Sequence, residues 1–267
     1  METRRLGSAD LSVPVIGMGT WQTYDVRDSS IVQPVTDTML TSGARFFDSS
    51  PMYGAAERVL AETLGSRRPE VIVATKVWAS TVREGRQQIQ QALDWYGRHL
   101  EVYQIHNLVA WETHLPVLEE LKAAGRIRAI GITHYGASQF GQMARVMKSG
   151  RVQTIQVPYN PEEREVEHML LPLAADLDVG IILMRPLGQG DLVRRSPPAR
   201  DLAFLADHGL QTWAQALLNW GLSDPRVTVS IPATRSVQHA ADDCAVGVAR
   251  RFDAATRARV AALAARL

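Results

Sequence analysis

The sequence predicts a single (β/α)8 barrel, a TIM barrel, that spans residues 1–267. Eight short apolar runs rich in Val and Ile alternate with amphipathic segments along the whole chain. The runs lack strict apolar–polar alternation, which is typical of parallel strands covered on both faces, and the chain length suits one such barrel. A doubly wound open sheet is the alternative fold, but no G-x-G-x-x-G motif follows any of the runs.

The expected elements follow one another in a regular order. Segments between the runs have helical periodicity, as in residues 115–125, where leucines share one face and a glycine ends the helix. Residues 253–267 are expected to add an extra C-terminal helix, and the widest gap, residues 188–210, to form a loop over one face. The eight expected strands are residues 13–18, 45–50, 70–77, 102–107, 127–134, 154–160, 180–187 and 226–233.

The composition argues against several classes of protein. Basic and acidic residues nearly cancel, at a net charge of +1, which gives no basic footprint for nucleic acid and no polybasic membrane anchor. The single Cys244 cannot form an internal disulfide, which suits a reducing compartment. Residues 1–12 lack the apolar segment of a signal peptide, and no apolar run approaches the ~18 residues of a membrane helix. We expect a cytoplasmic protein without nucleic-acid or membrane partners.

Polar side chains gather where three neighbouring strands end. Asp48 ends the second expected strand, Lys76 lies near the end of the third and His106 near the end of the fourth. Tyr53 follows in the loop after Asp48. Functional groups of α/β barrels lie at the carboxyl ends of the strands, so these four residues are expected to share one rim.

These four residue types make one proton-donating device. A free tyrosine has a pKa of ~10, and the ammonium of Lys76 is expected to lower the pKa of Tyr53. Asp48 is expected to hold Lys76, and His106 to orient a substrate oxygen toward Tyr53. An Asp–Lys pair or a histidine at a strand end also occurs for structural reasons alone. The four together favour catalysis on a carbonyl group, and no metal site is expected.

The chain resembles the aldo-keto reductase superfamily along nearly all of its length. The resemblance implies a (β/α)8 barrel with an N-terminal hairpin cap, and hydride transfer from NADPH to an aldehyde or ketone. It also implies that Tyr53 is the general acid, with Asp48, Lys76 and His106 in the roles given above. The segments that carry it, in family order, are RRLGSADLSVPVIGMGTW, FFDSSPMYG, ATKV, YQIHN, GRIRAIGITHY, QVPYN, RPLGQG and IPATRS.

The same resemblance implies an NADPH site that departs from the family pattern in places. Gln156 matches the residue that hydrogen-bonds the carboxamide, whereas Thr133 and His134 stand where many members have Ser and Asn. Met184 and Arg185 fall where many members stack a tyrosine on the nicotinamide, so thioether packing or an arginine–pyrophosphate contact is expected there. The implied residues on these strands and in the first and seventh loops are Gly19, Thr20, Trp21, Asp48, Thr133, His134, Gln156, Met184, Arg185, Leu187, Gly188 and Gln189.

The segment IPATRSVQHAADD bears on the choice between NADPH and NADH. Arg235 follows the last strand near a helix start, where a phosphate is stabilised, and some members carry an arginine here to bind the 2′-phosphate. Thr234 and Ser236 add hydroxyl groups. His239 takes the place of an arginine used in other members, and Asp243 stands where an asparagine commonly approaches the adenine. We expect NADPH as the cofactor.

The first βα loops are expected to line the substrate pocket, although each large side chain there can equally pack at the barrel rim. Many relatives continue into a tail that closes over the substrate. We therefore expect a more open pocket here, with some breadth of substrate. The expected pocket residues are Trp21, Tyr24, Met52, Trp78 and His106.

Three functions are compatible with such a barrel. An NADPH-dependent carbonyl reductase acting on a small molecule, as a monomer or weak oligomer, is expected. A catalytically weak, cofactor-binding regulatory subunit resembling the potassium-channel β subunits is the alternative. A lyase or isomerase needs a metal cluster or a Schiff-base lysine. The scattered histidines argue against the cluster, and Asp48 beside Lys76 argues against the free lysine.

Overall fold

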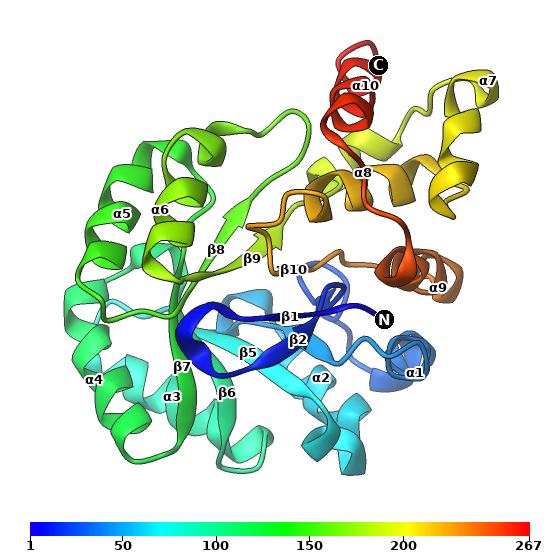
Figure 1. The fold of residues 1–267 in the computed structure, drawn as a ribbon. Coiled ribbons are helices and arrows are strands. Elements are labelled where there is room, and N and C mark those ends of the chain that lie inside the picture. Colours follow the sequence, from blue (N-terminus) through cyan, green and yellow to red (C-terminus); the bar gives the residue numbers. More distant parts are fainter.

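The computed structural model describes residues 1–267 and shows eight parallel strands arranged as a barrel, with helices around it (Figure 1). The strands follow one another from β3 to β10, and a parallel bridge between Ile16 and Ser230 brings the two ends of the sheet together. The predicted (β/α)8 barrel is confirmed. None of the helices combines the length and hydrophobicity that crossing a lipid bilayer requires.

Each barrel strand is followed by at least one helix, as the sequence predicts. The strands are β1 (Thr3–Arg5), β2 (Ser12–Pro14), β3 (Met18–Gly19), β4 (Phe46–Asp48), β5 (Ile72–Val77), β6 (Leu100–Ile105), β7 (Ile127–Thr133), β8 (Thr154–Pro158), β9 (Gly180–Met184) and β10 (Val229–Ser230). The helices are α1 (Gln33–Thr41), α2 (Ala56–Leu64), α3 (Val82–Trp95), α4 (Trp111–Ala123), α5 (Phe140–Lys148), α6 (Leu170–Leu177), α7 (Ala199–Leu202), α8 (Trp213–Leu222), α9 (Val237–Ala245) and α10 (Ala254–Ala264).

The expected strand at residues 13–18 divides into two. Its start belongs to β2, which pairs antiparallel with β1, and its end is the barrel strand β3. Between them the Gly17 N–H donates to the carbonyl of Ser230 at 2.9 Å, so the chain changes its pairing partner within the run. A continuous apolar run does not reveal such a change of partner.

The β1–β2 hairpin closes one end of the barrel interior and appears in dark blue across it in Figure 1. Between its strands, Leu6 is fully buried and packs in a cluster with interior residues such as Val102 and Ile182. Gly7 has φ +53°, and a Cβ there would lie 2.3 Å from the backbone nitrogen of Gly180. The hairpin therefore fits the barrel only because glycine stands at this position.

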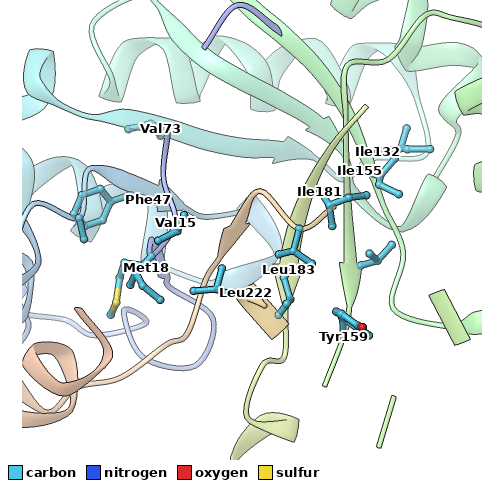
Figure 2. Close-up of a cluster of buried hydrophobic side chains, with 14 of the residues drawn as sticks. Val15, Met18, Phe47, Val73, Ile132, Ile155, Tyr159, Ile181, Leu183 and Leu222 are labelled. Atoms are coloured by element: carbon cyan, nitrogen blue, oxygen red, sulfur yellow. The ribbon is translucent and has the colours of Figure 1, made fainter. Parts of the chain in front are cut away.

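A larger apolar cluster fills the layer between the strands and the helices (Figure 2). Phe47 and Val73 come from neighbouring strands, Ile155 and Ile181 from another neighbouring pair, and Leu222 from helix α8. Strand side chains alternate between the two faces. Phe47 and Ile155 point outward to the helices, so their sequence neighbours Asp48 and Gln156 point into the barrel. This alternation places polar groups at its mouth.

The expected loop at residues 188–210 contains regular structure. It forms a 3-10 turn at Gly188–Val193, the short helix α7 and a second 3-10 turn at Ala203–His208. The Trp213 indole donates to the carbonyl of Leu192 at 2.9 Å and ties this segment to helix α8. These short turns were not predicted, because the prolines and arginines of the segment are typical of a loop.

Candidate active site

Four predicted residues come together at the mouth of the barrel. Asp48 ends β4, Lys76 is next to last in β5, and His106 directly follows β6. Tyr53 ends a 3-10 turn at Pro51–Tyr53, which the Ser50 side chain caps by accepting from the Met52 N–H. Asp48, Lys76 and His106 are almost fully buried.

Lys76 and Asp48 form an ion pair without solvent access. Lys76 Nζ donates to Asp48 Oδ2 at 2.6 Å and to the Ser49 carbonyl at 2.7 Å. Asp48 Oδ1 accepts from Gln104 Nε2 at 3.1 Å and from Gln156 Nε2 at 2.8 Å. Burial alone would lower the pKa of Lys76, but the charge of Asp48 and the hydrogen bond to its carboxylate outweigh it, so the pKa is raised and the lysine stays charged.

Tyr53 lies beside this pair, and its phenol holds its proton firmly. Lys76 Nζ is 5.1 Å from the centre of the Tyr53 ring, and the His106 ring meets it edge-on at 5.6 Å. Burial raises the pKa of Tyr53 above 10, although Lys76 and, more weakly, Arg185 oppose it. Lys76 lowers the pKa of Tyr53 as expected, but desolvation of the phenolate outweighs this effect, so the resulting pKa lies above its ordinary value.

His106 is neutral and held in one orientation. Burial, with smaller contributions from Lys76 and His134, lowers the pKa of His106 to about 2. The Ser50 hydroxyl lies 2.8 Å from His106 Nδ1 and already accepts from the Met52 N–H. A hydroxyl has two acceptor lone pairs, so this contact fits either tautomer of the ring; where Ser50 donates to Nδ1, the second ring nitrogen, Nε2, carries the N–H.

A cavity of about 820 Å³ opens over these residues. It is lined by Asp48, Tyr53 and His106, while Lys76 lies behind them. Most of the predicted cofactor residues reach it, and so do three of the predicted pocket residues. Those on its wall are Gly19, Thr20, Trp21, Met52, Gln156, Met184, Arg185, Leu187, Gln189, Thr234, His239 and Asp243.

Two predicted pocket residues lie elsewhere. Tyr24 is fully buried, and its hydroxyl pairs with the Thr36 hydroxyl at 2.8 Å, so it packs in the core behind the first loop. Trp78 is 43% exposed and does not line the cavity. Both predictions are wrong because a residue's place after a strand does not fix the direction in which the following loop turns.

Several predicted cofactor residues stand back from the cavity wall. The Thr133 hydroxyl accepts from the Asn107 N–H at 3.1 Å and is buried. His134 Nδ1 accepts from the Gly136 N–H at 2.9 Å, and its ring stacks on Tyr135. Neither side chain reaches the cavity, and Gly188 also stands outside it. Thr133 and His134 therefore shape the loop after β7 instead.

Arg235 and Ser236 make contacts within the protein. Arg235 Nε donates to the Thr23 carbonyl at 2.9 Å and Nη2 to the Gln22 carbonyl at 2.8 Å. Ser236 caps helix α9 by accepting from the His239 N–H. Arg235 thus closes the loop after β3 onto the start of α9, with one guanidinium nitrogen unused by the protein.

Gln156 was predicted to bind the carboxamide of the cofactor. It lines the cavity, but its side chain also donates a hydrogen bond to Asp48, which was not predicted. The sequence reading also missed Ser50 and Gln104. Gln104 stands two residues before His106 and therefore on the same strand face. This spacing could have identified it as a residue that points into the barrel. Tyr135 and Trp213 line the cavity too, and no sequence pattern marked them.

Asp243 is a buried carboxyl group on helix α9 that lines the cavity. It is 5% exposed, faces the cavity and has no hydrogen-bonding partner in the protein. Burial, with a smaller contribution from the neighbouring Asp242, raises the pKa of Asp243 to about 8. At neutral pH this group is therefore largely a neutral carboxyl, which can both donate and accept a hydrogen bond.

The chain is similar to known proteins in sequence and in fold. A model of the Aldo/keto reductase family matches residues 15–265. The chain is 26% identical over 253 residues to the methylglyoxal reductase YeaE of Escherichia coli, across 90% of this chain and 87% of that protein. The holo form of an aldo-keto reductase from Bacillus halodurans superposes with a TM-score of 0.83 at 22% identity, covering 98% and 96% of the two chains. An aldo/keto reductase from Klebsiella pneumoniae in complex with NADP and acetate gives a TM-score of 0.83 at 23% identity, covering 97% and 93%.

Proposed function

Because the chain belongs to the aldo/keto reductase family, we propose that it is an NADPH-dependent oxidoreductase that reduces an aldehyde or a ketone to an alcohol. The observation that carries the proposal is the buried Lys76–Asp48 pair beside the Tyr53 phenol on a large cavity. A buried ion pair is costly to desolvate. The position of this pair beside the partly buried Tyr53 phenol is explained if the phenol transfers a proton.

The residues on the cavity wall fit a dinucleotide. The volume of about 820 Å³ is at the upper end of the range for small-molecule sites. Asp243 offers an unpaired carboxyl at one wall, and Gln189 and Gly190 take left-handed backbone conformations in the loop after β9. The Klebsiella pneumoniae relative binds NADP, which supports the same cofactor here. When bound, the reduced nicotinamide would supply the hydride.

The protein's own residues would then handle the proton. The neutral His106 donates from Nε2 to the substrate oxygen and orients it, and Tyr53 donates its phenolic proton to the oxygen as negative charge develops there. The ammonium of Lys76 stabilises the phenolate that remains, and Asp48 keeps that ammonium charged and in place. Trp21 and Met52 on the cavity wall help to exclude water.

Fluorescence titration with NADPH and NADH, followed by turnover on an aldehyde panel that includes methylglyoxal, tests the proposal. We expect binding of NADPH and turnover that falls at least about 1000-fold in Tyr53→Phe, because general acid catalysis contributes roughly 10² to 10⁴ in rate. The Phe variant should retain its affinity for NADPH, which serves as the control for folding. Binding without turnover on any aldehyde would favour a regulatory barrel. If neither cofactor binds, the proposal is wrong.

A further inference from the structure

Arg185 has an unusual backbone at the end of β9. Its φ is +55°, in the left-handed region, and the next residue is Pro186. A side-chain-bearing residue before proline favours extended conformations, so this one is strained. The Asn160 amide holds the Arg185 carbonyl at 2.9 Å, and the Asn160 side-chain oxygen is itself held by two backbone N–H groups. The protein therefore fixes Arg185 in place at a cost.

The guanidinium of Arg185 has little to bind within the protein. It lies 5.0 Å from the centre of the Tyr135 ring, and its Nη1 is 3.6 Å from Glu163 Oε1, beyond hydrogen-bonding distance. No protein group accepts a hydrogen bond from it, in contrast to Arg164, which donates twice to Glu167. A planar fork of N–H donors is thus presented at the cavity wall.

The charges on the cavity wall are arranged unevenly. Arg185 is the only lysine or arginine among the lining residues. The carboxylate of Asp48 is already paired with Lys76, whereas Asp242 and Asp243 belong to helix α9 beside the last strand. Arg185 points the other way, toward residues that follow β7 and β8. Its charge also acts on Tyr53, where burial raises the pKa of the phenol and Lys76 and Arg185 oppose that shift.

We propose that Arg185 binds the carboxylate of an anionic carbonyl substrate, so that the enzyme prefers an aldehyde or ketone that carries a carboxylate over its neutral analogue. The inference rests on the proposed reductase function. The guanidinium fork matches the two oxygens of a carboxylate. Tyr135 supports the fork from one side, and Tyr53 with His106 receives the carbonyl end of the same molecule.

Two substrates that differ only by one methyl group and the charge it removes test the inference: 4-carboxybenzaldehyde and methyl 4-formylbenzoate. The measured quantity is the ratio of their kcat/KM values with saturating NADPH. In Arg185→Gln this ratio should fall about tenfold or more, mainly through KM of the acid, because a charge-assisted hydrogen bond is lost. Intrinsic reactivity differs between the two aldehydes, but it cancels when the variant is compared with the wild type.

Two further variants sharpen the test. Glu163→Gln removes the anion nearest to the guanidinium, so the ratio should rise rather than fall. Arg86→Gln makes the same arginine change in an exposed ion pair with Glu120, far from the cavity wall, and should leave the ratio unchanged.

The outcomes separate the inference from the reductase function. Turnover of both aldehydes with a ratio that Arg185→Gln leaves unchanged would overturn the role of Arg185 and leave the reductase standing. An unchanged ratio with a raised Kd for NADPH would assign Arg185 to the cofactor and overturn the inference. If the wild type turns over other aldehydes of the panel but not 4-carboxybenzaldehyde, the inference is overturned and the reductase function stands. If it turns over no aldehyde at all, both are overturned.

Discussion

At the scale of single residues, the site combines groups whose protonation states are set by burial. Tyr53 is kept protonated and His106 neutral, while Lys76 stays charged through its pair with Asp48. Each group therefore has a fixed form across the physiological pH range. In the proposed reaction, Tyr53 therefore has a proton to give, and the neutral imidazole can donate a hydrogen bond without adding positive charge beside Lys76.

The tautomer of His106 depends on Ser50, a contact that the sequence reading did not anticipate. Ser50→Ala removes the hydroxyl that donates to Nδ1 when the ring is protonated at Nε2. The fraction of imidazole with N–H at Nε2 should therefore fall. We expect kcat to fall about fivefold, since one hydrogen bond contributes roughly 1 kcal/mol. Long-range 15N NMR of His106 should show Nε2 protonated in the wild type and a tautomer mixture in the variant. A wild-type spectrum with Nδ1 protonated would contradict this prediction.

The same nuclei report on the low pKa of His106. With a pKa of about 2, the ring should not titrate between pH 5 and 8. A histidine titration with a midpoint near 6.5 assigned to His106 would contradict the burial described above.

Asp243 should make the protein less stable as the pH rises. Its pKa is about 8 in the folded protein, against an ordinary value of 3.8. The folded state thus holds the proton more tightly than the unfolded state, and stability falls between pH 4 and 8. Asp243→Asn cannot ionise, so its Tm at pH 9 should exceed that of the wild type by at least about 2 °C, a gain of roughly 1 kcal/mol.

Thermal melts from pH 5 to 9 without cofactor measure this effect. Asp191→Asn, at an exposed carboxylate, serves as the control and should shift little at any pH. Parallel pH curves for the wild type and Asp243→Asn would show that Asp243 is ionised in the folded protein throughout.

At the scale of elements, strand ends were predicted well and loops poorly. Asp48, Lys76 and His106 were found because strand register and alternation determine which side chains reach the barrel mouth. Tyr24 and Trp78 were misplaced because they lie in loops, where no periodicity fixes direction. The first expected strand was predicted as one strand, because an apolar sequence does not show which neighbouring strand each of its halves pairs with. Side-chain positions could thus be predicted in the regularly hydrogen-bonded strands but not in the loops.

The hairpin element offers a direct test of close packing. Gly7→Ala places a Cβ 2.3 Å from the Gly180 nitrogen and 2.7 Å from the Asp178 carbonyl oxygen, and the position also has positive φ. We expect a loss of about 3 kcal/mol or more in the free energy of unfolding, measured with urea. Gly125→Ala shares the positive φ but has no atom within 4 Å, so it should cost only about 1 kcal/mol. Equal losses for the two variants would show that backbone strain alone accounts for the effect.

At the scale of the whole molecule, the barrel is closed at one end and open at the other. The β1–β2 hairpin and the interior cluster around Leu6 fill the end where the strands begin. The cavity occupies the end where they finish, and its wall draws on loops after at least six of the barrel strands, from Thr20 to Asp243. Fold class and reaction chemistry could be predicted from the strands. The cavity's shape could not, because it depends on how the loops pack together.

The carboxylate of Asp48 also has a mechanical role. It lies on β4 and is joined to Lys76 of β5, Gln104 of β6 and Gln156 of β8. Half of the barrel's strands are therefore joined through one side chain that also has a part in the proposed reaction. Natural selection would remove a substitution at Asp48 for its effect on folding even in a lineage that had stopped turning over substrate. In descendants of this barrel, Asp48 would therefore be retained after the reaction is lost, because it holds the strands together.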